Sequence, residues 1–457
     1  MRNTLSIIGL VAVLLCGGCQ EAFSYTGGTM PDRPSADEPQ GDTHNEYSVR
    51  SASELSALKN LKPGDVVIWE DGIYENVTAK LSANGSTEGM ILLKARTPGK
   101  VIFKGKSSLT LNGQFLAAEG FSFTDLDTSA QYSVLTCAKG SSDCCFSNCK
   151  IDGSTSAVSS VDSKWVSLYG KRNEVSSCTF LDKRNMGCLF VVWMEDNIVP
   201  EHRILRNKFT RPYTHFDEKG SALNGQESIR IGTSTYSMSD AKCLVEGNWF
   251  LNCHGERAEI ISNKSCANTY KGNLFEDSYG TLTLRHGNNC VVTSNIFVCS
   301  GQPEMGGVRI IGEGHLVENN AMLGLTGGAG YNAGICFVKG ESNAALNGYW
   351  TVKNAVIRNN VLVDCKNSIL VNYGKRTTQD SCPQNVLFEG NTIISHVQTF
   401  VAVNVLDTPK KNLTWTGNRF YGGVCKGYSP KYEIVEPQVE DYSPRIANIK
   451  AQAGAKW

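Results

Sequence analysis

A short pattern occurs twice, 22 residues apart, in the segment Asn273-Leu-Phe-Glu-Asp-Ser-Tyr-Gly-Thr-Leu-Thr-Leu-Arg285-His-Gly-Asn-Asn-Cys-Val-Val-Thr-Ser-Asn295-Ile-Phe297. Each copy is an Asn followed two places later by a large apolar residue. The same column recurs along much of the chain, at intervals of 22 to 41 residues. A base period in the twenties, lengthened by insertions in single repeats, is typical of a solenoid. In the first two copies a Cys takes the place of the Asn. The copies begin at Cys149, Cys178, Asn207, Asn248, Asn273, Asn295, Asn320, Asn360, Asn391 and Asn418.

The residues between the copies favour strands over helices. Short β-rich runs such as Val291-Val292 and Ile310-Ile311 are separated by Gly and Asn, which predicts an all-β solenoid. An Asn at each bend tolerates left-handed backbone and can bond to the Asn above and below. The apolar residue two places on then points into the core. A leucine-rich repeat is the rival architecture, but its leucine framework is absent from the sequence.

A solenoid needs covered ends, because its terminal strands are otherwise unpaired. Ser51-Ala-Ser-Glu54 forms a capping box that leads into Leu55–Leu61, which we interpret as a short helix closing the N-terminal end. The repeat is lost from about Lys426, and we expect the remaining residues to wrap the other end. Residues 47–457 are therefore predicted to form one domain.

The first residues predict export. Arg2, an apolar run from Leu5 to Leu15 and a small-residue exit describe a signal peptide over residues 1–19. Cys19 lies in a sequence similar to a bacterial lipoprotein box, so we expect a lipid anchor at Cys19, with plain secretion as the alternative. The stretch 20–46 is rich in Pro, Gly, Ser and Asp and is interpreted as a flexible tether. The expected location is the periplasm, the outer membrane or the cell surface.

Charge and cysteine content narrow the function. The chain carries 44 basic and 44 acidic residues, so nucleic acid is not an expected partner, and any anionic ligand must be bound by a local patch. Of 17 cysteines, 15 lie beyond residue 19. Cys149 and Cys178 fall within strand-like runs, where a thiol is a small apolar filler. Cys144-Cys145 and the region from Cys253 to Cys266 could still hold a bridge.

Two basic residues, Lys264 and Arg285, are 21 residues apart, which places them one repeat apart. Lys264 ends the segment Gly255-Glu-Arg-Ala-Glu-Ile-Ile-Ser-Asn-Lys264-Ser265, and Arg285 ends the alternating strand Leu282-Thr-Leu-Arg285. One amine that can act as a base and one permanent cation suit proton abstraction next to a sugar carboxylate.

Several linked motifs, in order over about residues 47–425, resemble polysaccharide lyase family 6. That family contains alginate lyases and chondroitinase B on a right-handed parallel β-helix. The resemblance implies β-elimination at a 4-linked uronic acid, with a calcium ion neutralising the carboxylate, a lysine removing the C5 proton and an arginine assisting departure of O4. Lys264 matches the lysine and Arg285 the arginine. The motifs are Gly64-Asp65 with Asp71-Gly-Ile-Tyr74, Asn224-Gly-Gln-Glu-Ser-Ile-Arg-Ile-Gly232, Glu259-Ile-Ile-Ser-Asn-Lys264-Ser265, Arg285-His-Gly287 and Gly307-Val-Arg-Ile-Ile-Gly-Glu-Gly314.

The chain departs from the family's calcium site. Asn224 and Glu259 match two of its ligands, but Arg257 stands where the family has a second acidic residue. Calcium prefers six to eight oxygen ligands, so we expect no cofactor. Arg257 could then bind the substrate carboxylate directly, or form a salt bridge to Glu259. Calcium is the alternative, with Asn224, Glu259 and Glu256 as ligands if the strand bulges.

Proton transfer needs a neutral amine and a proton source. Nearby cations disfavour a charged ammonium, and Arg257 and Arg285 could supply that field for Lys264. Arginine is a poor proton donor, so His286 or water is expected to pass the proton to O4. Further candidates for substrate binding are Glu259, Asn224, His286, His254 and two arginines, Arg230 and Arg309. The two arginines are predicted to face outward from equivalent strands. Aromatic residues that could stack on sugar rings are Trp165, Trp193, Tyr213 and Tyr331.

The sequence therefore predicts a monomeric lyase that cleaves alginate, preferring mannuronate, and leaves 4,5-unsaturated oligosaccharides. One alternative is a dermatan or chondroitin sulfate lyase on the same fold. A β-helical glycoside hydrolase would need two suitably placed carboxylates. A noncatalytic glycan-binding lipoprotein is the remaining alternative.

Overall fold

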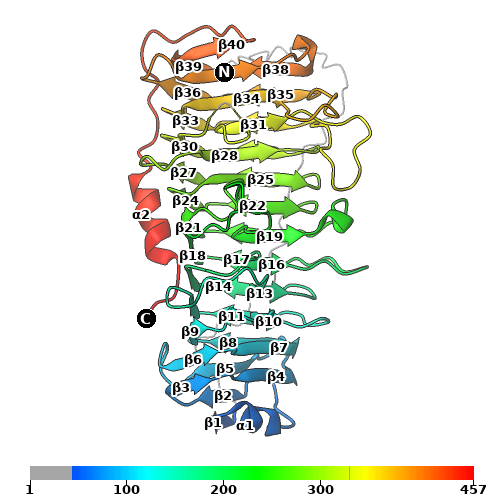
Figure 1. The fold of residues 1–457 in the computed structure, drawn as a ribbon, viewed down its shortest axis with the longest axis vertical. Helices are drawn as coiled ribbons and strands as arrows, with labels where there is room; N and C mark the ends of the chain where they lie inside the picture. Colours follow the sequence, from blue (N-terminus) through cyan, green and yellow to red (C-terminus); the bar gives the residue numbers. More distant parts are fainter. Residues whose placement is uncertain (1–43, 329) are drawn as a thin grey trace, which may run out of the picture. The chain divides into compact units, whose positions relative to one another are not determined.

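The computed structural model describes residues 44–328 and 330–457. Within these residues the strands form three parallel sheets, and each turn of the chain contributes one strand to each sheet in the order A, B, C (Figure 1). The expected fold class, a right-handed parallel β-helix, is confirmed. The predicted signal peptide at 1–19 and most of the tether at 20–46 lie outside the described residues. No helix in the described part is long and apolar enough to cross a membrane.

The elements have the following bounds. Sheet A contains β1 (Glu46–Val49), β2 (Val66–Trp69), β5 (Ile91–Ala95), β8 (Leu116–Glu119), β11 (Cys145–Ser147), β14 (Glu174–Ser176), β17 (Arg203–Leu205), β20 (Leu244–Glu246), β23 (Thr269–Lys271), β26 (Val291–Thr293), β29 (Leu316–Glu318), β32 (Val356–Arg358), β35 (Val386–Glu389) and β38 (Leu413–Thr416). Sheet B contains β3 (Gly72–Glu75), β6 (Val101–Gly105), β9 (Ser122–Leu126), β12 (Lys150–Asp152), β15 (Thr179–Leu181), β18 (Lys208–Arg211), β21 (Trp249–Cys253), β24 (Leu274–Glu276), β27 (Ile296–Val298), β30 (Ala321–Leu323), β33 (Val361–Val363), β36 (Thr392–Ser395) and β39 (Arg419–Gly422). Sheet C contains β4 (Thr78–Asn84), β7 (Ser108–Gln114), β10 (Ser133–Cys137), β13 (Lys164–Leu168), β16 (Phe190–Val192), β19 (Ile229–Gly232), β22 (Glu259–Lys264), β25 (Gly280–His286), β28 (Met305–Ile310), β31 (Ile335–Val338), β34 (Asn367–Tyr373), β37 (Val401–Val405) and β40 (Val424–Lys426). The helical elements are α1 (Ala52–Ala57), η1 (Ser234–Tyr236), η2 (Lys410–Asn412) and α2 (Ser443–Gln452).

The Asn column forms a buried ladder at the turn from sheet A into sheet B. Asn295, which is fully buried, accepts hydrogen bonds on its amide oxygen from the backbone and side-chain nitrogens of Asn273, each at 2.9 Å. It donates in turn to the amide oxygen of Asn320, at 3.0 Å. The same bonds join successive Asn residues from Asn207 to Asn418. The predicted bonding between stacked asparagines is confirmed.

The predicted backbone of that column was wrong. The left-handed residue is the one before each ladder Asn, for example Gly272 (φ 59°), Ser294 (φ 59°) and Asn319 (φ 55°). The reason is that the chain bends one position earlier, which leaves the ladder side chain pointing into the turn, where it satisfies backbone groups that would otherwise be buried without partners.

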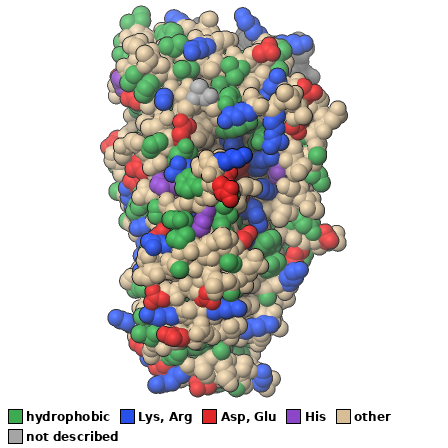
Figure 2. Space-filling view, viewed as in Figure 1, with side chains coloured by type: hydrophobic (Ala, Val, Ile, Leu, Met, Phe, Trp, Pro, Cys, Tyr) green, Lys and Arg blue, Asp and Glu red, His purple; other side chains and the backbone are tan. Residues whose placement is uncertain are grey.

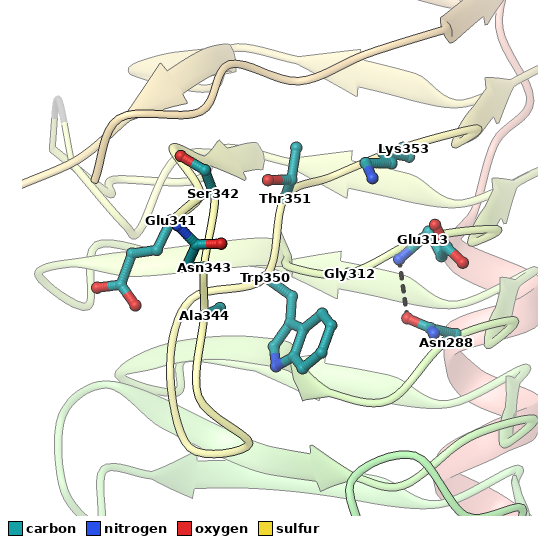
Figure 3. A pocket seen from close by; sticks show the side chains of 10 residues that line it. All are labelled: Asn288, Gly312, Glu313, Glu341, Ser342, Asn343, Ala344, Trp350, Thr351 and Lys353. Atoms are coloured by element: carbon teal, nitrogen blue, oxygen red, sulfur yellow. Dashed lines mark hydrogen bonds between the residues drawn. The ribbon is translucent and has the colours of Figure 1, made fainter. Parts of the chain in front are cut away.

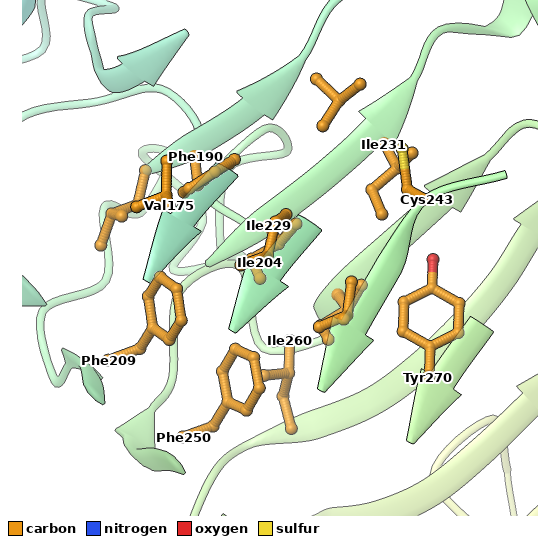
Figure 4. Close-up of a cluster of buried hydrophobic side chains, with 14 of the residues drawn as sticks. Val175, Phe190, Ile204, Phe209, Ile229, Ile231, Cys243, Phe250, Ile260 and Tyr270 are labelled. Atoms are coloured by element: carbon orange, nitrogen blue, oxygen red, sulfur yellow. The ribbon is translucent and has the colours of Figure 1, made fainter. Parts of the chain in front are cut away.

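Apolar side chains fill the interior, as the period predicts (Figure 4). The residue two places after each ladder position is buried, and the rings of Phe180, Phe209, Phe250, Phe275 and Phe297 stack with centroids 4.5 to 5.1 Å apart. The buried Cys149 and Cys178 lie in the ladder column and pack as small fillers.

The structure answers the question of a disulfide bridge for one of the two regions considered. Cys253 and Cys266 are both unbridged thiols, so the bridge considered for that region is not formed in the described chain. The Cys144 Sγ lies 3.3 Å from the carbonyl oxygen of Gly113, and the side chain is buried.

Both helices cover apolar surface. The side chain of Ser51 accepts a hydrogen bond from the Glu54 amide at 3.1 Å, and Leu55 of α1 is buried in the main core. The helix α2 lies along the outer face of sheet B (Figure 1), where Tyr442 packs with Leu274 and Ile296. The tail after Lys426 first covers the last coil, as expected, where Tyr428 stacks on Trp415 with ring centroids 4.2 Å apart. Its later part, which includes α2, runs beside the middle coils, and the loss of the repeat did not indicate that position.

We expect Asn295→Ala to lower the free energy of unfolding by about 2 to 3 kcal/mol, because it leaves buried groups of Asn273 and Asn320 without partners. Asn343→Ala, at an exposed loop position, is the control. Urea unfolding followed by circular dichroism measures both, and equal midpoints for the two variants would contradict a stabilising role for the ladder.

Candidate active site

The outer face of sheet C is polar over its middle coils. In the row that faces outward, Arg230 of β19 pairs with Ser262 of β22, which is followed by Thr283 of β25 and Arg309 of β28. The residues on either side of both arginines have their side chains buried in the core, so the predicted outward direction of Arg230 and Arg309 is confirmed. Figure 2 shows Lys and Arg side chains gathered in a hollow on this face.

A β-bulge places Arg285 beside Lys264. The pairing of β22 with β25 runs from Asn263 opposite Leu284 directly to Lys264 opposite His286, so Arg285 is the extra residue on β25. A bulge re-aims a side chain locally. Lys264 and Arg285 therefore project from the same ends of neighbouring strands, as a joint action on one sugar requires.

Lys264 is half-buried at the end of β22. Within residues 44–328 and 330–457 its amine makes no hydrogen bond or ion pair, so no carboxylate competes for it. Its charge contributes to the lowered pKa of His286. The amine is therefore available to a ligand lying on the face of sheet C.

Arg285 is held by a loop that the sequence showed only as a long interval between Asn320 and Asn360. Its Nη1 donates to the Gly348 carbonyl at 2.9 Å, and its Nη2 to the Asn347 carbonyl at 3.1 Å. The guanidinium stacks on Tyr349, with its Cζ 4.4 Å from the ring centroid. Burial lowers the pKa of Arg285 from its usual value. A further contact of Nη1 with the His286 Nδ1 leaves two of the five N–H donors for a ligand.

His286 supports Arg285 and is itself almost inaccessible, with 2% of its surface exposed. Its Nδ1 lies 3.4 Å from the Arg285 Nη1, and its Nε2 lies 3.3 Å from the Ser234 Oγ. Burial, followed by the charges of Arg285 and Lys264, lowers the pKa of His286 to about 3. The imidazole is thus neutral near pH 7 and carries no spare proton for a leaving group, contrary to one expectation from the sequence.

Three buried glutamates cluster at the other end of β22. One carboxylate oxygen each from Glu227, Glu256 and Glu259 lies within 4.8 Å of the others. Burial, then Glu227 and Glu259, raise the pKa of Glu256 well above its ordinary value. The Glu227 Oε2 has no hydrogen-bond partner in the described residues. We call these three residues the glutamate triad.

The glutamate triad fits a hard divalent cation, which prefers carboxylate oxygens. The bend over 255–258 turns Glu256 inward, so that its carboxylate lies close to those of Glu227 and Glu259. The calcium alternative requires this position of Glu256. Asn224 is exposed, and the amide of the next residue, Gly225, donates to the Glu256 Oε2 at 2.7 Å. Glu227 is a further carboxylate beside Glu256 and Glu259.

Arg257 is exposed at the bend before β22, in a left-handed conformation (φ 57°). Its Cζ lies 4.8 Å from the ring centroid of Phe216 and 5.1 Å from that of Tyr279. The considered salt bridge to Glu259 is not formed, because Glu259 pairs with Arg309 instead. Arg257 is therefore a surface cation held between two aromatic rings, with its charge open to an anionic ligand.

The remaining candidates are dispersed around this centre. Arg309 is only 7% exposed, because the ring of Tyr331 covers it. Its role is therefore to orient Glu259, and it is not exposed for contact with a ligand in solvent. Arg230 lies 5.4 Å from the centroid of Trp193. His254 is half-buried near Arg257, and burial lowers its pKa. Of the aromatic candidates, Trp165 is 2% exposed in the core and cannot stack on a sugar.

A cavity of about 400 Å³ lies between residues 341–351 and the turns after β25 and β28 (Figure 3). Trp350, Glu313 and Lys353 line it, and neither Lys264 nor Arg285 does. It is therefore separate from the centre described above.

Three contributors to this site were missed from the sequence. Glu227 was quoted within a motif without a role, and only its buried position reveals it. Gly348 and Tyr349 belong to an insertion whose length was visible but whose fold was not. The signal that could have found Glu227 is a charged residue two positions before the first apolar residue of β19.

The chain is similar to known polysaccharide lyases. A family model described as chondroitinase B matches residues 49–415. The alginate lyase AlyGC, of polysaccharide lyase family 6, is 30% identical with a TM-score of 0.79, and the match covers 90% of this chain but 56% of AlyGC. A mannuronic acid specific family 6 lyase from human gut microbiota is 26% identical, with a TM-score of 0.75 and coverage of 90% and 96%. The lyase Pedsa3628 from Pseudopedobacter saltans shares the fold at 24% identity, with a TM-score of 0.73 and coverage of 90% and 99%. No curated protein matches the chain.

We expect calcium to raise the thermal unfolding midpoint of the protein, because a cation that binds only the folded state adds about 2.7 kcal/mol at a hundredfold excess over its Kd. Glu227→Gln should abolish the rise, whereas Glu218→Gln, on the exposed loop leading to the same strand, should keep it. Differential scanning fluorimetry with and without a chelator measures the effect. An unchanged midpoint in the wild type would exclude tight calcium binding at the glutamate triad.

Proposed function

The chain belongs to the chondroitinase B family, polysaccharide lyase family 6, and from this premise we propose that it cleaves alginate by β-elimination at 4-linked uronic acid residues. The observation that carries the proposal is the pairing of an uncommitted amine, Lys264, with a fixed guanidinium, Arg285, at the same ends of β22 and β25. Alginate as the substrate is supported by two relatives with this fold that are at least 25% identical to the chain. They are AlyGC, an alginate lyase, and a mannuronic acid specific lyase.

The reaction moves one proton from C5 to O4 with water as the carrier. Lys264, once its amine is deprotonated, takes the proton from C5, and the electron pair of that C–H bond forms the C4–C5 double bond. The C4–O4 bond breaks, O4 leaves with the bonding pair and receives a proton from water, and the hydroxide that remains takes the proton from the Lys264 ammonium. The N–H groups of Arg285 that the loop leaves free stabilise the charge that develops on O4. The products are a chain with a new hydroxyl end and a 4,5-unsaturated uronate.

Removal of the C5 proton is slow while the adjoining carboxylate keeps its full negative charge. Arg257 is the exposed cation suited to pair with that carboxylate, since its planar guanidinium matches a carboxylate in two parallel hydrogen bonds. A cation bound by Glu227, Glu256 and Glu259 would supply further charge neutralisation. Neutral His286 keeps Arg285 aimed at the leaving oxygen without taking a proton itself.

Mannuronate is the proposed preference. Its support is the replacement of a family carboxylate by Arg257, together with the printed specificity of the gut microbial relative, which matches along 96% of its own length. The family's description as chondroitinase B keeps dermatan and chondroitin sulfate as a second candidate substrate. We further propose export, anchoring through Cys19 and a monomeric state, all of which rest on the sequence.

We expect Lys264→Met to reduce the rate of cleavage at least about 100-fold, because removal of a general base costs 10²–10⁴-fold. The rise of ultraviolet absorbance from the new double bond, on mannuronate, guluronate and dermatan polymers, measures the rate. Lys219→Met, an exposed lysine on the loop before β19, should behave as wild type. Full activity in Lys264→Met, or products without an unsaturated end, would refute the elimination.

Arg257→Ala should lower kcat/KM on polymannuronate about tenfold to a hundredfold, since a hydrogen bond to a charged group is worth about 1.5 to 3 kcal/mol. Arg206→Ala, on the surface of the turn from sheet A into sheet B, is the matched control. Comparison of the loss on polymannuronate and polyguluronate tests specificity. The same kcat/KM as wild type on both polymers would remove Arg257 from the site.

A further inference from the structure

The outward row of sheet C changes character beyond Arg309. The next residues in the row are Cys336 of β31 and Leu370 of β34, and they are 0% and 2% exposed. They point away from the main core, whose members on the same strands include Ile335, Phe337 and Ile369. The outward row is thus polar on the strands that carry Lys264 and Arg285. On β31 and β34 it is apolar and buried.

A second hydrophobic cluster, outside the solenoid, covers these positions. Its buried members are Ile311, Ala333, Cys336, Val338 and Leu370, and half-buried aromatic residues including Tyr331 and Tyr373 pack over them. This cluster occupies the space that a polysaccharide would need if it continued along the outer face of sheet C.

Two tyrosines from opposite edges of sheet C meet over its outer face. Tyr331 lies before the start of β31, whereas Tyr373 ends β34, yet their ring centroids are 5.0 Å apart with the planes at 85°. A Cβ placed on Gly330 would lie 3.4 Å from the Tyr373 hydroxyl, so that ring reaches across to the opposite edge. We call this pair the Tyr331–Tyr373 wall.

Cations line the near side of the wall. The Arg309 Cζ and the Lys375 Nζ lie 5.2 Å and 5.4 Å from the Tyr331 centroid, and Arg376 stacks on Tyr349 at 4.8 Å. Two strand spacings separate β25 from β31, which is a distance of about 10 Å. Only a short stretch of a uronate chain fits between Arg285 and the wall, and its carboxylates would meet Lys375 and Arg376.

The opposite side of the site offers a different surface. Directly after β13 and β16, the rings of Tyr169 and Trp193 stack with centroids 5.8 Å apart, and both are half-exposed. Arg230 lies against Trp193. Aromatic faces next to a cation suit sugar rings that carry carboxylates.

We propose that the Tyr331–Tyr373 wall closes one end of the substrate groove, so that the enzyme acts from a chain end and releases short products. The polymer lies across Trp193 and Arg230, and its terminal residues fill the closed end beside Lys375 and Arg376. This inference rests on the proposed lyase activity and adds the direction and length of the bound chain.

The test follows product size and viscosity against the ultraviolet absorbance of the new double bond on polymannuronate. The wild type should yield short unsaturated products from the first time points, with little loss of viscosity per bond cleaved. Tyr331→Ala combined with Tyr373→Ala should open the groove, give longer early products and raise the loss of viscosity per bond severalfold. Tyr331→Phe combined with Tyr373→Phe keeps both rings and should retain the wild-type product sizes and loss of viscosity per bond cleaved.

Early long oligomers and a rapid fall of viscosity with the wild-type enzyme would refute the proposal that the Tyr331–Tyr373 wall closes the groove, whatever the results with the variants. This measurement does not depend on whether the alanine variant folds. A failure of the proposed function looks different, because no ultraviolet absorbance would then develop on any uronate polymer. A correctly folded alanine variant, shown by an unchanged thermal midpoint, with the wild-type product pattern would also overturn the proposal.

Discussion

The buried asparagine ladder is the constraint on which the rest of this structure depends. Each coil must bend between sheets A and B, and each bend leaves backbone groups inside the protein that need partners. Successive asparagines supply them, bonding to one another from Asn207 to Asn418. The ladder holds neighbouring coils in register, so residues one repeat apart, such as Lys264 and Arg285, come to lie on neighbouring strands.

The active site is made by departures from that regular repeat. A bulge in the pairing of β22 with β25 aims Arg285 beside Lys264. An insertion after β31 returns Gly348 and Tyr349 to hold the guanidinium. The bend before β22 turns Glu256 inward and Arg257 outward. The solenoid supplies rigid strands, and its irregular turns supply the chemistry.

Charge is divided along the site. Basic side chains lie at the Lys264 end of β22. Carboxylates gather at the other end, where burial and the neighbouring Glu227 and Glu259 raise the pKa of Glu256 well above its ordinary value. Burial keeps His286 neutral beside the Arg285 guanidinium.

The sequence by itself determined the β-solenoid repeat and the capping helix, because these follow from periodic spacing and from a local capping motif. The resemblance of its motifs to a known family added the parallel β-helix and singled out Lys264 and Arg285. The sequence misplaced the left-handed residue by one position and gave Glu227 no role. Only the tertiary structure decided the glutamate triad, the partner of Glu259, the neutral state of His286 and the Tyr331–Tyr373 wall. These depend on burial and on contacts between turns of different coils, and no spacing along the chain records how an irregular turn folds back onto a sheet.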